Sequence, residues 1–378
     1  MPVGKLKNTV YGLALPVAGK RCEWSAAHGD DVQKCLHRHH AVGACIQRFE
    51  NGKLTDCHAV GYASVGSEKR LVTPQTVFRT ASVAKMVTAL LVFRLQTLNR
   101  LHVQEDISEF LGYPVRNPHC PDAPITLGML LSHTSGIVDS PAYFASFQQS
   151  VSLKNLLEDP QVFLPAIPGM HFRYSNLAAG MIGCLLESRF DMSFEELAQQ
   201  ELFKPLGAEA TFDVSRVDAA HAADSWRVLP AAQAFDMKAR SAAAKPIDEP
   251  APDTHYLLAS GSLFLTAEAL AKLTLTAWNG ADGFLDETSV LQMRKPILGW
   301  PQPEVRMQHG MGLFELDDRK VSHRKLWGHQ GFAYGAVNGV FFDAQGNGFA
   351  SLNSGCSERR IGHLALINRD LIRLWMKK

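Results

Sequence analysis

Strand signals at the two ends of the chain, with helix signals between them, constrain the fold most. Two alternating segments, 42–49 and 54–62, flank Asn51-Gly52, a dipeptide typical of a tight hairpin turn. Four more strand-like segments lie near the C-terminus, at 305–316, 325–330, 335–342 and 348–353. Because strands need partners, the simplest arrangement is one antiparallel sheet assembled from both ends of the chain.

The middle of the sequence is predicted to be helical. A helix over about 81–98, with Thr80 as its N-cap, has a strong apolar face. Further helices are predicted at 31–39, 126–132, 153–158, 177–188, 194–202, 267–278 (capped by Thr266) and 357–376. The stretch 206–256 shows little periodicity and is interpreted as a long connection.

These patterns predict an α/β (α+β) fold with an antiparallel sheet, flanking helices and an inserted all-helical domain. We expect residues 1–75 and 257–378 to form the sheet domain. Residues 76–256 are expected to form the helical domain with long loops, and the active site should lie at the interface of the two.

Composition excludes several classes of protein. The 378 residues are 46% hydrophobic, enough for a large core, and the net charge of +1 gives no electrostatic case for nucleic acid. No apolar run reaches the roughly 18 residues of a transmembrane helix. Lys5 and Lys7 precede a mildly apolar stretch, but Pro16 interrupts it, which makes a cleaved signal peptide the weaker interpretation. We expect a cytoplasmic protein, periplasmic or secreted if that signal is real; the oligomeric state stays open.

The cysteines and histidines suggest neither a disulfide framework nor a metal site. The seven cysteines are an odd number without a CxxC pair, which fits a reducing compartment. A two-residue turn at Asn51 would place Cys45 opposite His58, on the other face of the hairpin from Cys57, so that the two cysteines could not bond. The dense His37-Arg38-His39-His40 segment lacks suitable carboxylates, so we predict no metal and no cofactor.

Ser82 and Lys85 stand three residues apart at the start of the predicted 81–98 helix. They would share one helix face, and burial among apolar neighbours would lower the lysine pKa enough for it to accept the serine proton. A capping serine with a snorkelling lysine explains the pair equally well. A second Ser-x-x-Lys, at Ser322 and Lys325, shows how easily the pattern arises.

Two other segments contain side chains suited to catalysis or binding. Tyr174 precedes a predicted helix and could move a proton, and Asn176 could bind a substrate amide, although both could simply cap and pack. His329 lies on a predicted strand, where Gly331 would let a ligand approach the backbone. An ordinary strand histidine is the alternative interpretation.

Taken together, the order, flanks and spacing of Ser82, Tyr174 and His329 resemble the serine β-lactamase and DD-peptidase superfamily. The likeness is greatest to the class C β-lactamase branch with its esterase and D-aminopeptidase relatives, and it covers roughly residues 40–375. Three further segments agree with it, at 130–137, at Pro168-Gly169 and at 259–264.

The resemblance implies a role for each matching residue. Ser82 is the nucleophile that becomes acylated, and Lys85 and Tyr174 act as general base and acid. Asn176 binds the acyl-side amide of the substrate. The backbone N–H groups of Ser82 and Phe332 form the oxyanion hole. His329-Gln330-Gly331 fills the third motif on the strand that lines the cleft.

The third motif departs from that of efficient class C β-lactamases, which carry Lys-Thr-Gly there. His329 loses its charge near neutral pH and would hold a substrate carboxylate less firmly, and the longer Gln330 could narrow the cleft. We therefore predict a serine hydrolase (an esterase, D-peptidase or weak β-lactamase) acting on a small-molecule or peptide substrate. The alternative is a penicillin-binding, sensing or assembly protein that acylates with little turnover. An α/β-hydrolase is excluded because the chain has no GxSxG.

Overall fold

The structure is a computed structural model and describes residues 30–65, 69–149, 151–228, 233–235 (backbone only), 244–301 and 303–376. The candidate signal peptide lies outside the described residues. Among the described residues, no helix is both long and apolar enough to cross a membrane.

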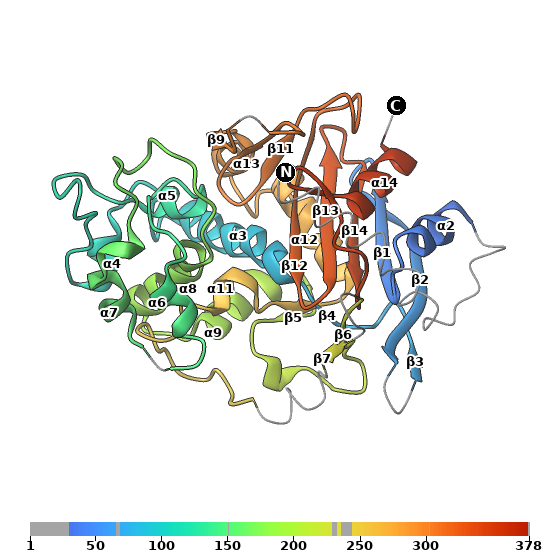
Figure 1. Ribbon diagram of the computed structural model, residues 1–378, viewed down its shortest axis with the longest axis horizontal. Coiled ribbons are helices and arrows are strands. Elements are labelled where there is room, and N and C mark those ends of the chain that lie inside the picture. The colour runs from blue at the N-terminus through green and yellow to red at the C-terminus, as the bar shows by residue number, and fades with distance from the viewer. Residues whose placement is uncertain are drawn as a thin grey trace.

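A nine-stranded antiparallel sheet forms the centre of the molecule (Figure 1). Its order is β3-β2-β1-β14-β13-β12-β11-β10-β9, so the N-terminal hairpin pairs with the C-terminal strands through β1 and β14. The strands are β1 (Gly43–Glu50), β2 (Lys53–Val65), β3 (Lys69–Leu71), β9 (Leu298–Gly299), β10 (Met307–His309), β11 (Phe314–Leu316), β12 (Leu326–Ala333), β13 (Ala336–Asp343) and β14 (Gly348–Asn353). The predicted fold class is confirmed.

Helices cover both faces of this sheet. Successive side chains of a strand point to opposite faces, and apolar side chains on each face are buried under helices. Ile46 and Phe341 pack in a core with α2 (Asp31–Arg38) and α14 (Leu366–Trp375). Cys45 and Val340 belong to the larger core on the other face. That core contains α12 (Ala267–Asn279), α13 (Glu287–Arg294) and α3 (Ala84–Thr97).

The remaining helices gather on the side of α3 away from the sheet, on the left in Figure 1. They are α4 (Ile107–Leu111), α5 (Leu127–Leu131), α6 (Pro141–Ala145), α7 (Leu153–Glu158), α8 (Asn176–Phe190), α9 (Phe194–Ala198) and α11 (Leu258–Gly261). Their N-caps are mostly side-chain oxygens, as with Thr126 before α5 and Ser175 before α8. The domain boundaries expected above stay a prediction.

Short elements complete the described chain. They are β4 (Phe78–Arg79), β5 (Ala210–Thr211), β6 (Ser225–Arg227), β7 (Gln233–Phe235), β8 (Phe264–Leu265), β15 (Arg360–Ile361), β16 (Leu364–Ala365), the 3-10 helices η1 (Ala81–Val83), η2 (Pro160–Val162) and η4 (Val214–Arg216), and the π-helix η3 (Gln199–Phe203). The predicted connection at 206–256 therefore holds several short elements.

The predicted register of the N-terminal hairpin is wrong beyond its turn. Glu50 pairs with Lys53 as expected, but a β-bulge shifts the strands, and Cys45 pairs with Ala59 instead of His58. The Gln47 side chain stabilises the bulge by donating to backbone carbonyls on both strands. Cys45 and Cys57 consequently share a face, with their sulfurs 3.6 Å apart as free thiols.

Three other predictions of secondary structure need correction. Thr80 makes no side-chain cap; its hydroxyl donates to the carbonyl of Leu263, and the helix starts with the 3-10 turn η1. The segment 357–376 is helical only from Leu366, because β15 and β16 form a small hairpin before it. The strand predicted at 305–316 is divided into β10 and β11.

Candidate active site

Ser82 lies in η1, directly ahead of the buried helix α3 whose first turn holds Lys85. Ala81 has a φ of +53°, a left-handed conformation that a residue with a Cβ rarely adopts. Strain of this kind clusters at functional sites, where the surrounding packing maintains it. The turn places the Ser82 hydroxyl 3.1 Å from Lys85 Nζ.

Lys85 is only 4% exposed, and Nζ has two further partners. It lies 2.6 Å from the carbonyl oxygen of Ser260 and 2.9 Å from Asn176 Oδ1. Burial lowers the pKa of Lys85 to about 7, although the carboxylate of Asp139 raises it and Arg79 lowers it further. The amine is therefore substantially uncharged at neutral pH and above.

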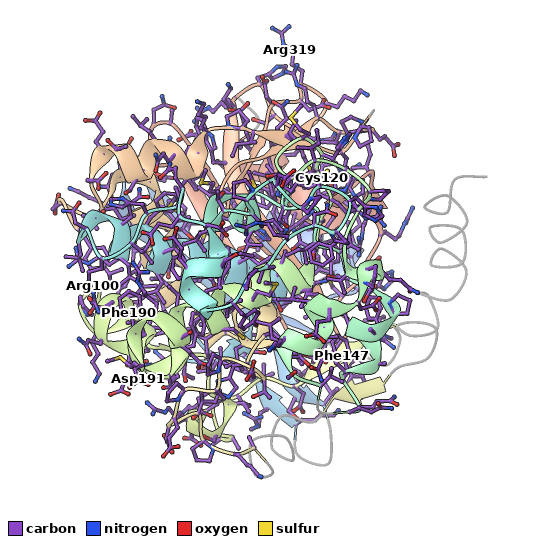
Figure 2. The ribbon with its side chains drawn as sticks, turned by 90° about the vertical axis from the view of Figure 1, so that its left-hand side faces the viewer. Arg100, Cys120, Phe147, Phe190, Asp191 and Arg319 are labelled. Atoms are coloured by element: carbon purple, nitrogen blue, oxygen red, sulfur yellow. The ribbon has the colours of Figure 1, made fainter. Side chains whose placement is uncertain are left out.

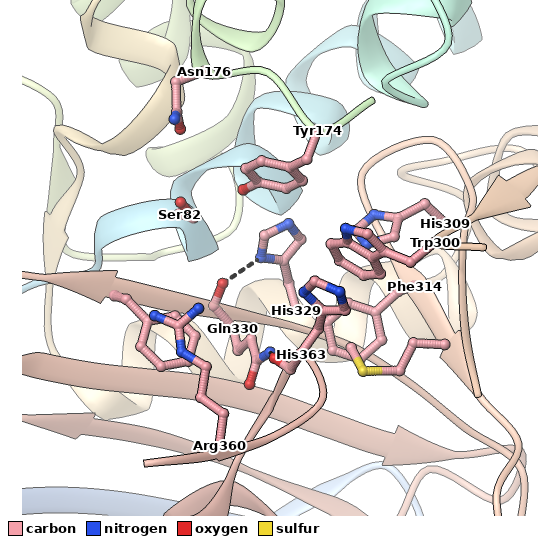
Figure 3. A pocket seen from close by; sticks show the side chains of 12 residues that line it. Ser82, Tyr174, Asn176, Trp300, His309, Phe314, His329, Gln330, Arg360 and His363 are labelled. Carbon is pink, nitrogen blue, oxygen red and sulfur yellow. Dashed lines mark hydrogen bonds between the residues drawn. The ribbon is translucent and has the colours of Figure 1, made fainter. Parts of the chain in front are cut away.

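Tyr174 and Asn176 come from the segment that leads into α8. Burial raises the pKa of the Tyr174 phenol well above its usual value, and a hydrogen bond with Ser82 lowers it in part. The phenol is thus protonated at neutral pH. Figure 3 shows its hydroxyl directed toward Ser82. The Lys85 ammonium nitrogen lies 5.1 Å from the centre of the Tyr174 ring.

Asp139 anchors this segment and was not among the residues singled out from the sequence. One carboxylate oxygen accepts from the backbone N–H groups of Asn176 (2.7 Å) and Leu177 (2.9 Å) and from the Ser175 hydroxyl (3.0 Å). The other oxygen accepts from Asn176 Nδ2 at 2.8 Å. The only sequence signal for this role is its place two residues beyond the 130–137 segment.

The third motif lies on β12, next to η1. β11 pairs with β12 only from Leu326 to Gly328, and beyond that point η1 takes its place beside the strand. A Cβ on Gly331 would stand 2.5 Å from the carbonyl oxygen of Thr80 and 2.7 Å from the backbone nitrogen of Ser82. Glycine is therefore required for the close approach of β12 to η1, which brings Phe332 beside Ser82.

The two polar side chains of this motif, His329 and Gln330, are both uncharged, so neither presents a positive charge to the cleft. His329 is 3% exposed, and burial together with the Lys85 charge lowers its pKa to about 3, despite a hydrogen bond between Nδ1 and the Gln330 carbonyl. The Gln330 amide is engaged behind the strand: it donates to the carbonyl of His363 and accepts from Ala365 and Asn368. Neither residue is suited to hold a substrate carboxylate.

Two pockets meet at Ser82. The first pocket, of about 370 Å³, is drawn in Figure 3 and has largely aromatic and imidazole walls. It is lined by Ser82, Tyr174, Asn176, Trp300, Met307, His309, Phe314, His329, Gln330, Phe332, Arg360 and His363. The second pocket, of about 550 Å³, shares Ser82, Asn176 and Phe332 with the first and opens toward α6.

All seven candidate site residues therefore lie together: five line the first pocket, Gly331 lies against the backbone of Ser82, and Lys85 lies behind Ser82. Trp300, His309, Arg360 and His363 were missed: the last three lay in segments predicted as a longer strand (305–316) and a longer helix (357–376), and no sequence signal marked Trp300. The other Ser-x-x-Lys is structural: the Ser322 hydroxyl donates to the carbonyl of Met376, and Lys325 pairs with Glu315. In the described part of the chain, no group of three His, Cys, Asp or Glu side chains could hold a metal ion.

A family model described as beta-lactamase matches residues 30–370 of this chain. The chain belongs to the beta-lactamase family. Among curated relatives, Protein flp of Staphylococcus aureus (strain MRSA252) is 27% identical over 180 residues, which is 46% of this chain and 35% of flp. The match thus spans about a third of that relative. Penicillin-binding protein 4 of Amycolatopsis lactamdurans is 25% identical over 292 residues, 74% of this chain and 73% of the relative.

Solved structures of the beta-lactamase fold are also similar. EstCE1, described as a hydrolase with promiscuous acyltransferase activity, superposes with a TM-score of 0.74 at 21% identity, covering 95% of this chain and 99% of its own. The D-amino acid amidase from Ochrobactrum anthropi SV3 gives 0.68 at 18% identity, covering 95% and 97%. The octameric penicillin-binding protein homologue from Pyrococcus abyssi gives 0.72 at 20%, covering 90% and 75%. At these identities the likeness establishes the fold, and the predicted superfamily is confirmed by the family match.

Proposed function

We propose that this protein is a serine hydrolase that cleaves neutral esters through an acyl-enzyme on Ser82. The observation that carries the proposal is the arrangement around Lys85 Nζ. A neutral amine has two N–H donors and one lone pair. The Ser260 carbonyl and Asn176 Oδ1 can only accept, so they take the two donors. The lone pair is then left for the third neighbour, the Ser82 hydroxyl.

The reaction follows from these positions. Ser82 Oγ attacks the ester carbonyl while its proton passes to Lys85 Nζ. The oxyanion is held by the backbone N–H groups of Ser82 and Phe332, and each such donor contributes about 3 kcal/mol in comparable enzymes. Tyr174 gives its proton to the leaving alkoxide and regains one from Lys85. Water then attacks the acyl-enzyme, with the same groups acting in reverse.

The third motif favours neutral substrates over β-lactams that carry a carboxylate. His329 is uncharged in its buried position, and the Gln330 amide already has its partners. A carboxylate at this motif would lose hydration without gaining the lysine that β-lactamases supply there; the cation in the lining of the first pocket is Arg360, whose guanidinium lies over the Phe332 ring. The likeness in fold to EstCE1, described as a hydrolase with promiscuous acyltransferase activity, supports a hydrolase that forms an acyl-enzyme.

Turnover of a 4-nitrophenyl ester and of a penicillin, with intact mass measured in parallel, tests this proposal. We expect steady ester turnover, at least about a hundredfold loss in Ser82→Ala and in Lys85→Arg, and slow or undetectable penicillin hydrolysis. Arginine stays protonated and cannot accept the proton, so an active Lys85→Arg variant would show that Lys85 is not the base. A stable penicillin adduct without ester turnover would instead favour a sensor that acylates once.

A further inference from the structure

The two pockets that meet at Ser82 can be told apart by Tyr174. Ser82, Asn176 and Phe332 line both pockets, but Tyr174 lines only the first. In the proposed reaction Tyr174 protonates the leaving oxygen, so that oxygen must lie within its reach. The alcohol part of the ester therefore enters the first pocket, and the acyl part extends into the second.

One wall of the second pocket is a cluster of aromatic rings from α6 and the turn after it. The ring centres lie 5.5 Å apart for Tyr143 and Phe144, 5.0 Å for Tyr143 and Phe147, and 5.9 Å for Phe144 and Phe147. Tyr143 is buried beneath the pair, whereas Phe144 and Phe147 are 55% and 54% exposed. Figure 2 shows Phe147 at the surface of the helical side. Contiguous exposed rings at the edge of a pocket are typical of a binding surface.

The charged residues of the second pocket are all cationic. Arg79 and Arg227 line it, and the Arg79 guanidinium lies over the Tyr334 ring, 4.8 Å from its centre. Among the described residues that line the two pockets, none is an aspartate or glutamate. The nearby Asp139 carboxylate already accepts four hydrogen bonds from the start of α8. A free ammonium group on the acyl chain would therefore meet two guanidinium groups and no carboxylate among the described lining residues.

We propose that the second pocket is the acyl-binding subsite and that it selects aromatic or other bulky apolar acyl groups without a free ammonium group. This inference rests on the proposed function, because it depends on Tyr174 being the acid for the leaving group. It distinguishes the protein from enzymes that release amino acids from their amides or esters, which must accommodate the amino group beside the scissile carbonyl.

Three 4-nitrophenyl esters with the same alcohol test the selectivity: acetyl, 3-phenylpropanoyl and phenylalanyl. The last two differ only in the ammonium group. We expect kcat/KM for 3-phenylpropanoyl to exceed that for acetyl by at least about tenfold, since one apolar group in a pocket gives about that discrimination. Both enantiomers of the phenylalanyl ester should be cleaved at least about tenfold more slowly than the 3-phenylpropanoyl ester.

Variants of Phe144 and Phe147 test whether the aromatic wall of the second pocket causes the acyl selectivity. Phe144→Ala and Phe147→Ala should each lower the 3-phenylpropanoyl to acetyl ratio, and the double variant should bring it close to one. Leu291→Ala is the matched control, because Leu291 is an exposed apolar residue (58%) on α13 outside both pockets. It should leave the ratio unchanged.

A second series of esters, in which only the alcohol varies, tests whether the first pocket binds the alcohol part. With one acyl group and alcohols of increasing size, Trp300→Ala should change the ranking, whereas the Phe147→Ala variant should preserve it. Equal rates for acetyl and 3-phenylpropanoyl esters, preference for the phenylalanyl ester, or altered alcohol selectivity in Phe147→Ala would overturn the inference. If the wild-type protein hydrolyses none of these esters in a Ser82-dependent way, the proposed function itself is refuted. The two failures are therefore distinguishable.

Discussion

At the scale of single residues, the site depends on how the hydrogen bonds of one buried amine are distributed. Lys85 can serve as a base only if Asn176 presents its oxygen, because an amide N–H in that place would compete for the lone pair. Asp139 fixes this choice: its carboxylate can only accept, so Asn176 Nδ2 faces Asp139 and Oδ1 faces Lys85. Asp139 is thus a positioning residue for the base.

Asp139→Asn should lower kcat/KM by about a hundredfold, because Asn176 and the Lys85 amine would no longer be held in place, and a displacement of about 1 Å at a reacting group has an effect of this size. The variant removes the carboxylate that raises the Lys85 pKa, so the pKa falls and the acidic limb of kcat/KM moves to lower pH. In the wild type this limb should lie near pH 7. A pH profile checks both effects.

Asp286→Asn provides a matched control, because Asp286 caps α13 in the same way, far from Ser82 along the chain. It should keep the wild-type rate and the wild-type pH limb. An Asp139→Asn variant with reduced activity but an unmoved limb would show that Asp139 supports the fold of this segment without acting on Lys85.

The residue-level site was only partly predictable. Ser82, Lys85, Tyr174 and His329 stand in short local patterns whose chemistry is visible in sequence. Asp139, by contrast, acts across 37 positions on Asn176, and no local pattern signals that contact. The neutral state of His329 likewise depends on burial, which the sequence does not fix at one position.

At the scale of elements, the proposed oxyanion hole lies where η1 meets β12. On the side away from β13, β12 lacks a strand partner at this point, and Gly331 allows the backbones of η1 and β12 to meet. The left-handed Ala81 turns the chain so that Ser82 faces the strand before α3 begins. Both features belong to the junction of two elements and to neither one alone.

Gly331→Ala should reduce kcat by roughly a hundredfold or more, the effect of losing one oxyanion donor. Its Cβ would meet backbone atoms of Thr80 and Ser82, so the strand and the 3-10 turn must separate. Ester turnover, with circular dichroism to confirm folding, measures the effect. Gly183→Ala on α8, where a Cβ meets only ordinary contacts of 3.5 Å and longer, should stay active. Full activity in Gly331→Ala would contradict the oxyanion assignment.

Elements with a clear periodicity were predicted well, and those set by tertiary contacts were not. α7 and α12 were expected within a residue of their observed bounds, because apolar spacing and a capping side chain agree there. The hairpin β15–β16 was expected as helix, since its apolar residues continue the spacing of α14. The bulge in the N-terminal hairpin depends on hydrogen bonds from Gln47 that no turn signal indicates.

At the scale of the whole molecule, the sheet from both chain ends and the helices between them bring the three motifs to one place. Ser82 comes from η1 directly ahead of α3, Tyr174 from the segment before α8, and His329 from β12. Three buried imidazoles lie at or beside this site, in addition to the buried amine of Lys85. His133, His309 and His329 are each 3% exposed, and burial lowers all three pKa values.

Acid should therefore destabilise the native state. His329 has a native pKa of about 3 against a usual 6.5, so the unfolded state binds more protons between these values. Stability is complete above about pH 6.5 and falls as the pH drops toward 3; at pH 5 His329 alone accounts for about 2 kcal/mol. Denaturant unfolding at pH 7 and pH 5 measures this loss.

His329→Asn should show a smaller loss of stability between pH 7 and pH 5 than the wild type, because asparagine does not titrate and can keep the hydrogen bond to the Gln330 carbonyl. His221→Asn is the control, since the His221 side chain is 60% exposed. If the free energy of unfolding has the same pH dependence in His329→Asn and in the wild type, the pKa of His329 is not lowered in the native state.

The proposed chemistry is tested most directly by locating the acyl group. The protein is mixed with a 4-nitrophenyl ester, quenched in acid within the first turnovers, digested and examined by mass spectrometry. We predict the mass of one acyl group on the peptide that contains Ser82, and accumulation of this adduct ahead of steady turnover. Unchanged ester turnover in Ser82→Ala, or an acyl group found only on another residue, would contradict the assignment of Ser82 as the nucleophile.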